Sequence, residues 1–357
     1  MAKEKLHEMK NTSSSFQIRG VVTGTASQRF YKSGAGKNGG QWNSLEFGVK
    51  IAEGKTVYIS MRGFPRDEVF YYKRGENGAK GTTKRVAWKD RKKSQGDGYR
   101  LIGVNISTGR DENGKNVNES FVEYDAIEWL HDNLHDNDSV FIKGSLQFSS
   151  YTDRNGQTRK KIELVPNQIS YTQKPVNFDA DDYTEMAEFE NTIVFQSIDK
   201  EEDESGKATG RFILSGYSIG YNSVESVSFI VDADHAKLAT NLKKAMKDGY
   251  SIKTFGRIDV IVDTTMVESD DSGWGESSPM ERLNAPVRRE YVVYRADPGS
   301  ISKDEYSAEE IATAIRKINA AKVAAENFGE KAGKSVDISV DDDEWSTDDD
   351  SDDAPWD

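Results

Sequence analysis

VFIKGSLQF, residues 140–148, carries the clearest signal of the fold, because apolar and polar side chains alternate along it. Val140, Ile142 and Leu146 fall on one face, and a period of two is typical of a half-buried β-strand. DRNG follows at positions 153–156, and Asn-Gly accepts the positive φ angles that a tight hairpin turn requires. This part of the chain therefore predicts a long two-stranded hairpin.

Similar strand-like segments dominate the chain up to residue 300. They are short, rich in Val, Ile, Tyr and Phe, and separated by Gly, Asn and Asp, which is the pattern of a β-rich domain. The candidates in the first half are residues 16–31, 42–51, 56–64, 99–107, 139–149 and 159–171.

The same plan recurs 112 residues later, where SIKTFGRIDV at 251–260 aligns with SVFIKGSLQF at 139–148. Gly256 then matches Gly144, and the helix-like segments before them match at the same offset. The matched pairs are Leu130 with Leu242, Leu134 with Met246, and Asp136 with Asp248. Each half thus predicts three strands, a helix and two strands. This is the element order of an OB-fold, a small barrel that binds oligonucleotides across its second and third strands.

We therefore predict a mainly β fold with two tandem OB-fold-like barrels, each with a helix between its third and fourth strands. A C-terminal helix should follow, because Ser307 and Glu310 fit a capping box before an apolar stripe. The predicted segments are a flexible N-terminus at 1–15, a basic OB-fold domain at 16–172 with a large insertion at about 65–121, a linker at 173–188, a second OB-fold-like domain at 189–302, an amphipathic helix at 303–330 and a disordered acidic tail at 331–357.

The net charge of −13 is unevenly distributed along the chain. Residues 1–175 hold 29 basic and 20 acidic side chains, whereas residues 176–340 hold 19 and 31. Within the insertion, residues 80–100 hold eight basic side chains and two acidic ones. Such an asymmetry is typical of a chain of which one part meets a polyanion.

The chain has no cysteine, which excludes disulfides, thiolate zinc sites and a cysteine nucleophile. Its first residues lack the apolar core of a signal peptide, and no apolar run approaches the ~20 residues that span a bilayer. We therefore expect no membrane association. We expect a cytoplasmic protein, in the bacterial host cytoplasm if the chain is viral.

Signals for catalysis are poor. His131 and His135 have the i, i+4 spacing of zinc ligands, but the glutamate of the metalloprotease motif is missing. GEKAGKS at 329–335 is one residue too short for a phosphate-binding loop and follows a predicted helix rather than a strand. With four histidines in the whole chain, we expect no enzyme, no metal site and no cofactor.

Binding of single strands without sequence preference needs a positive groove and exposed aromatic faces. The first half places cations beside aromatics in RFYK, GKNGGQW, MRGFPR and FYYKR. The candidate nucleic-acid-binding residues are Arg29, Tyr31, Lys32, Lys37, Trp42, Arg62, Phe64, Arg66, Tyr71, Lys73, Arg74, Lys80, Lys84, Arg85, Trp88, Arg91, Lys92, Lys93 and Tyr99.

The last stretch, DDDEWSTDDDSDDAPWD at 341–357, holds ten carboxylates and no lysine or arginine. No core can form there, because few of its side chains are apolar and the charges repel one another. Its two tryptophans, Trp345 and Trp356, suit docking into a basic, apolar-floored pocket on a partner. The same charges can compete with nucleic acid for the chain's own basic surface. A tail that only keeps the chain soluble is the simpler alternative.

Barrel order, basic–aromatic pattern and tail together resemble single-stranded DNA-binding proteins of the bacterial and phage type. GSLQFSSYTDRNGQTRKKIELVPNQI at 144–169 is similar to the hairpin of strands 4 and 5 in that family. The tail resembles the acidic C-terminal peptide through which members recruit replication or recombination proteins, although Asp357 follows the aromatic and Trp replaces the usual Phe. The partner-binding tail residues that the resemblance implies are Asp352, Asp353, Pro355 and Trp356.

We therefore predict sequence-independent binding and protection of single-stranded DNA in phage DNA replication or recombination. An RNA-binding or duplex-binding module would show the same electrostatics. A further alternative is an acidic DNA mimic that inhibits a host enzyme, in which case the acidic second half would be the active part. A homo-oligomer is compatible with each of these functions.

Overall fold

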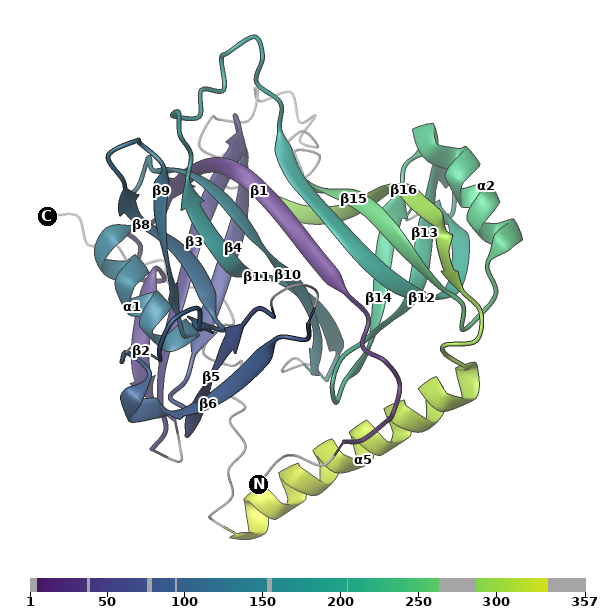
Figure 1. The fold of residues 1–357 in the computed structure, drawn as a ribbon. Helices are drawn as coiled ribbons and strands as arrows, with labels where there is room; N and C mark the ends of the chain where they lie inside the picture. The colour runs from purple at the N-terminus through teal and green to yellow at the C-terminus, as the bar shows by residue number, and fades with distance from the viewer. Residues whose placement is uncertain are drawn as a thin grey trace, which may run out of the picture.

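A computed structural model describes residues 5–36, 39–75, 79–93, 95–152, 156–203, 205–262 and 287–332. The prediction of a mainly β fold is confirmed, because most of these residues lie in strands (Figure 1). One mixed sheet contains 13 strands, and a separate sheet contains three. Within the described ranges, no helix is long and apolar enough to cross a bilayer.

The N-terminal unit, residues 14–171, follows the OB-fold order up to its third strand. Its elements are β1 (Ser14–Thr23), β2 (Tyr31–Ala35), β3 (Gln41–Ala52), β4 (Lys55–Gly63), β8 (Val104–Arg110), β9 (Asn116–Phe121), α1 (Glu123–Asn133), β10 (Ser139–Thr152) and β11 (Thr158–Tyr171). β1 pairs with β3 and β10, and β10 pairs with β11. On the side away from β10, β11 pairs in parallel with β8 and not with β4. The third strand of the predicted first barrel is therefore interrupted, and the chain returns after the insertion to complete it.

The C-terminal unit, residues 186–302, forms a complete ring of strand pairs. Its elements are β12 (Met186–Glu202), β13 (Ala208–Ile219), β14 (Val224–Val231), the short turn η2 (Ala233–His235), α2 (Ala236–Ala245), β15 (Ser251–Val262) and β16 (Val287–Ser302). β12 pairs with β13 and β15, β13 with β14, and β15 with β16. β14 then runs parallel to β16, as the third and fifth strands of an OB-fold do.

The helices of the two units end in the same way, as the predicted repeat requires. Leu134 donates its backbone N–H to the carbonyl of Leu130 at 2.9 Å, and Met246 donates to Leu242 at the same distance. All four side chains are buried. The predicted match between the two halves therefore corresponds to equivalent positions in the fold.

A row of four residues joins the units through their first strands. Phe16 of β1 lies opposite Gly144 of β10 on one side and opposite Phe189 of β12 on the other. Phe189 in turn lies opposite Gly256 of β15. A Cβ atom on Gly144 would lie 2.6 Å from the Phe16 ring, and one on Gly256 would lie 2.3 Å from the Phe189 ring. Each glycine therefore makes room for the phenylalanine of its own unit.

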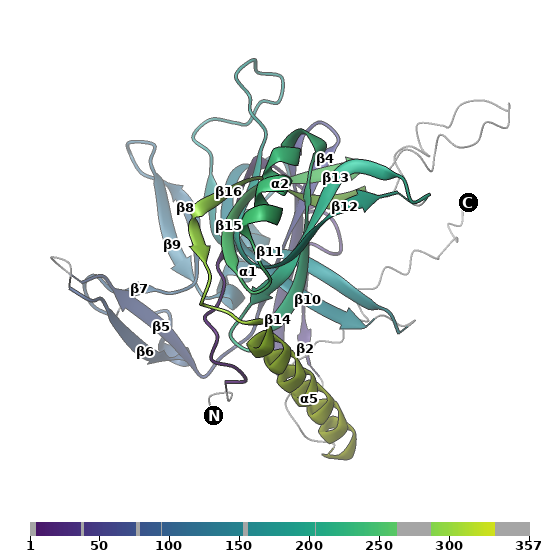
Figure 2. The same cartoon turned by 90° about the vertical axis from the view of Figure 1, so that its right-hand side faces the viewer.

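The insertion divides into two parts. Residues 68–101 form the separate sheet, with β5 (Glu68–Lys73) between β6 (Thr82–Ala87) and β7 (Arg100–Leu101), and the short turn η1 (Trp88–Asp90) follows β6. β8 and β9 form a hairpin on the main sheet instead. Figure 2 shows the three-stranded sheet, hereafter the inserted sheet, projecting to one side of the molecule.

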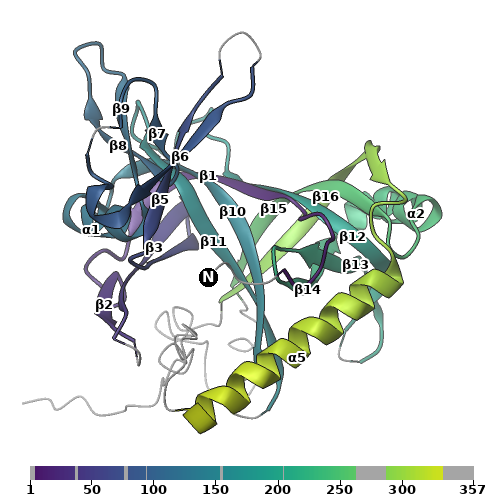
Figure 3. The ribbon, with the colours of Figure 1, turned by 60° about the horizontal axis from the view of Figure 1, so that its bottom comes forward.

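The hairpin that the sequence predicted most clearly bridges the two units. β10 and β11 run from the N-terminal unit toward β14 of the C-terminal unit (Figure 3). Ser150 donates to the carboxylate of Glu225 at 2.9 Å, and the ammonium of Lys160 lies 3.0 Å from the hydroxyl of Ser226. These contacts add to the β1–β12 ladder, so the units hold a fixed relative position.

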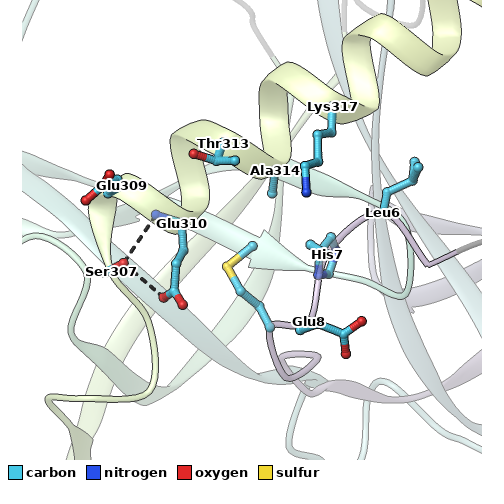
Figure 4. A pocket seen from close by; sticks show the side chains of 10 residues that line it. Leu6, His7, Glu8, Ser307, Glu309, Glu310, Thr313, Ala314 and Lys317 are labelled. Atoms are coloured by element: carbon cyan, nitrogen blue, oxygen red, sulfur yellow. Dashed lines mark hydrogen bonds between the residues drawn. The ribbon is translucent and has the colours of Figure 1, made fainter.

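The C-terminal helix α5 (Ala308–Ala332) closes one end of the C-terminal unit. The Ser307 hydroxyl accepts the backbone N–H of Glu310 at 3.2 Å, so the predicted N-cap is confirmed. The helix buries Ile311 and Ile318, and a cavity of about 630 Å³ separates it from the N-terminal segment (Figure 4). His7 of that segment is buried in its wall.

Replacing Gly144 by alanine should lower the free energy of unfolding by about 1–3 kcal/mol, because the added methyl group would meet the carbonyl oxygen of Val165 at 2.0 Å and the Phe16 ring. The matched control is Gly109→Ala, where the added methyl group meets nothing within 4 Å. Urea denaturation of both variants measures the difference. Equal midpoints for the two variants would contradict the packing argument.

Candidate nucleic-acid interface

The outward face of β2, β3 and β4 is the part of the N-terminal unit that corresponds to the binding face of an OB-fold. The strands are paired so that Lys32 lies opposite Ser44, and Ser44 lies opposite Arg62. Opposite residues project from the same side of a sheet. Lys32 and Arg62 therefore flank β3 on this face, as two of the predicted binding residues.

Four cations from three separate segments lie near Glu46 on the same face. Burial raises the pKa of the Glu46 carboxyl, and four nearby positive charges act against that rise. In order of decreasing effect they belong to Arg29, Lys161, Arg289 and Lys32. Arg29 precedes β2, Lys161 comes from β11, and Arg289 comes from β16 of the other unit. We call the surface formed by these four cations and Arg62 the basic face.

Two aromatic side chains lie on the same side of the strands. Trp42 lies opposite Gly34, and a Cβ atom on Gly34 would lie 2.9 Å from the indole ring. The ring therefore rests against the backbone of β2, which holds it in place. Tyr58 of β4 is 50% exposed, and its backbone carbonyl accepts a 3.4 Å hydrogen bond from Arg289. Exposed rings among cations are what unpaired bases require.

Arg91 does not project from the inserted sheet as a phosphate ligand would. Its guanidinium makes two hydrogen bonds to the Asp125 carboxylate of α1, at 2.8 and 2.9 Å, and lies 4.1 Å from the centre of the Trp88 ring. Tyr71 is buried and donates its hydroxyl to the backbone carbonyl of Arg91. Arg91, Trp88 and Tyr71 together attach the inserted sheet to α1. The prediction of direct nucleic-acid contact is therefore corrected for Arg91 and Tyr71.

Tyr31 also points away from the basic face. It lies opposite Leu45, which is buried in the core, and its ring centre lies 4.3 Å from that of His131 on α1. The predicted base contact of Tyr31 is therefore corrected as well, because the alternation along β2 directs its ring toward the helix.

The remaining predicted residues are scattered over the insertion. Arg66 lies 3.4 Å from Glu123, Lys93 lies 2.6 Å from Asp90, and Lys84 lies over the Tyr99 ring. The others are exposed or half-buried, with Phe64 directly after β4 and the rest on the inserted sheet and its flanks; they are Phe64, Lys73, Arg74, Lys80, Arg85 and Lys92. Lys37 and the tail residues Asp352, Asp353, Pro355 and Trp356 lie outside the described residues.

Three side chains on or beside the basic face, Tyr58, Lys161 and Arg289, were not predicted from the sequence. Tyr58 alternates with the buried Val57 and Ile59, so the period of two along β4 could have identified it. Lys161 and Arg289 belong to strands far along the chain, and only the fold brings them to Glu46. No local pattern in the sequence indicates that meeting.

The C-terminal unit pairs Arg211 and Arg257 with its own carboxylates. Arg211 contacts the carboxylates of Glu201, Asp232 and Glu290, and Arg257 lies 2.5 Å from Asp232. An ion pair presents little net charge to a polyanion. The cavity beside α5 is lined by Glu8, Glu309 and Glu310, which also disfavours an anionic ligand. The basic face is therefore the better candidate for nucleic acid.

A family model described as YorF matches residues 74–331. The chain belongs to the YorF family. The matched range of this YorF-family chain begins just after β5 and includes β6, β7, α1, the bridging hairpin and the whole C-terminal unit. No curated protein matches the sequence.

Among solved structures, two forms of the single-stranded DNA-binding protein from Thermus aquaticus are similar to this chain. A deletion mutant is 10% identical with a TM-score of 0.37, covering 80% of this chain and 94% of its own. The wild-type protein is 9% identical with the same TM-score, covering 81% and 93%. A Plasmodium falciparum SSB complex with single-stranded DNA is 10% identical with a TM-score of 0.17, covering 46% and 90%. Overlap at this level does not carry a function from one protein to another.

Arg91→Ala should loosen the inserted sheet, because it leaves the Asp125 carboxylate, which is 6% exposed, without its bidentate partner. Breaking a buried pair costs about 3–5 kcal/mol. Hydrogen exchange of the β5 and β6 amides should accelerate. The control is Lys89→Ala, which removes an exposed charge from the same turn. Unchanged exchange in Arg91→Ala would show that the pair does not attach the sheet.

Proposed function

We propose that this chain binds single-stranded DNA without sequence preference, and that the basic face is its principal contact surface. One observation carries the proposal: four cations from three separate segments lie near Glu46, on the face that OB-folds use for oligonucleotides. Trp42 and Tyr58 supply rings on the same face. No catalytic step is part of the proposal.

The bound strand would contact both units, because Arg289 belongs to β16 whereas the other cations belong to the N-terminal unit. The β1–β12 ladder and the bridging hairpin fix these segments relative to one another. A surface that is already assembled loses little conformational entropy on binding. This argument supports the N-terminal unit with one edge of the C-terminal unit as the binding module.

The biological setting of the proposal is phage DNA replication or recombination, with a cytoplasmic location. The acidic tail would recruit partner proteins and would compete with DNA for the basic face, since its ten carboxylates carry the charge of a short polyanion. RNA is the second candidate ligand, because stacking platforms and cations serve both nucleic acids.

Oligo-dT should bind the full chain with an affinity that falls as salt rises, at a slope near −0.7 per phosphate contacted. Arg289→Gln should weaken binding and reduce that slope by about one contact. Arg288→Gln is the matched control, because the neighbouring side chain projects from the other side of β16 and pairs with Glu290 at 2.5 Å. A fluorescence titration at several salt concentrations gives both values. Absence of binding by the unaltered chain would refute the proposal.

Glu46→Gln should strengthen oligo-dT binding, because it removes the one carboxylate around which the four cations gather. Since the pKa of Glu46 is raised, lowering the pH should neutralise it earlier than an ordinary glutamate and strengthen binding in the unaltered chain. In Glu46→Gln this part of the pH dependence should vanish. Equal pH profiles for Glu46→Gln and the unaltered chain would show that the DNA does not bind beside Glu46.

Removing the acidic tail should raise DNA affinity at low salt and have little effect at high salt, because screening weakens the competition between tail and DNA. The comparison is a titration of residues 1–336 against the full chain. Matched affinities at low salt would exclude competition for the basic face.

A further inference from the structure

The inserted sheet has an uncovered face that carries two aromatic rings and two arginines. Phe70 lies opposite Arg85, and Tyr72 lies opposite Arg100, so all four project from one side. Phe70 is 39% exposed and Tyr72 is 42% exposed. The opposite side of the sheet, which includes Tyr71, is buried against α1. This uncovered face is not part of the basic face described above.

Gly81 fixes the position of the Tyr72 ring. A Cβ atom at position 81 would lie 2.4 Å from Cζ of Tyr72 and 2.5 Å from Cε2, so the ring rests directly on the backbone just before β6. Arg85 lies 5.7 Å from the centre of the Phe70 ring. Each ring is thus supported from within the sheet while much of it stays exposed. A ring that is already held in place binds a base without first losing rotamer freedom.

We infer that this face is a second stacking platform for unpaired bases, and that it takes a further part of the strand held by the basic face. The inference rests on the proposed function. The charge on the platform selects this occupant, because Arg85 and Arg100 project from the same side as the two rings, and Glu68 lies 3.9 Å from Arg85 only. Backbone phosphates require such cations beside the stacked bases.

A strand that reaches both surfaces must be longer than one that fills the basic face alone. OB-folds take ~4–16 nucleotides each, and the inserted sheet projects away from the main sheet (Figure 2). The platform should therefore add affinity for long oligonucleotides and none for short ones. This length dependence distinguishes the second platform from a residue that supports the basic face.

The test compares oligo-dT of about 8 and about 40 nucleotides on the full chain, lengths set by the site size of an OB-fold. The double variant Phe70→Ser/Tyr72→Ser should lose about five-fold or more in affinity for the long strand, as the loss of one stacked base predicts. Its affinity for the short strand should not change. Arg100→Gln should weaken long-strand binding with no aromatic ring removed. In the unaltered chain, iodouracil in the long strand should crosslink to Tyr72 on irradiation.

Tyr221→Ser is the matched control, because Tyr221 is 55% exposed on the C-terminal unit and its loss should affect neither strand. Equal long-strand affinity in the double variant and the unaltered chain, with no crosslink at Tyr72, would overturn the inference while leaving the proposed function intact. Failure of the unaltered chain to bind either strand would refute the proposed function itself. A thermal melt of each variant separates loss of binding from loss of folding.

Discussion

The pairing of Phe16 with Phe189 lies at the centre of the β1–β12 ladder that joins the two units. Because these residues occupy equivalent positions in the two units and lie opposite one another, the units are related by an approximate two-fold axis through this pair. Gly144 and Gly256 flank it symmetrically, and both ladders shift register at these glycines. Two units that resemble the halves of a symmetric dimer are thereby joined into one continuous sheet within a single chain.

The two units share one backbone plan but differ in their third strand and in their charged side chains. The N-terminal unit interrupts its third strand with the inserted sheet and gathers cations around the half-buried carboxylate of Glu46. The C-terminal unit completes its ring and pairs its arginines with carboxylates such as Asp232 and Glu290. The two units therefore differ in how their cations are placed, although Arg289 of the C-terminal unit reaches Tyr58 of the N-terminal unit.

A glycine beside an aromatic ring recurs in the basic face, in the inserted sheet and in the core. Trp42 rests on Gly34 in the basic face, and Tyr72 rests on Gly81 in the inserted sheet. The absent side chain lets the ring approach the backbone, where dispersion contacts hold it. The same device in the core places Phe16 against Gly144. Small residues therefore decide the position of large ones, both where the rings build the core and where they stay exposed.

Local patterns along the chain were enough to predict the alternating hairpin, the two matched helical segments that contain Leu130 and Leu242, and the cap at Ser307. They also revealed the repeat, because Gly144 and Gly256 occupy matched positions in the two halves. Each of these glycines makes room for a phenylalanine ring. Packing in three dimensions, by contrast, settled which face of each strand is covered. FYYKR offers aromatics on both faces, and only contact with α1 buries Tyr71 and leaves Tyr72 exposed. Likewise, Lys161 and Arg289 reach Glu46 only because the barrel order and the β1–β12 ladder bring distant strands together. The local alternation of side chains cannot indicate contacts between residues so far apart in the sequence.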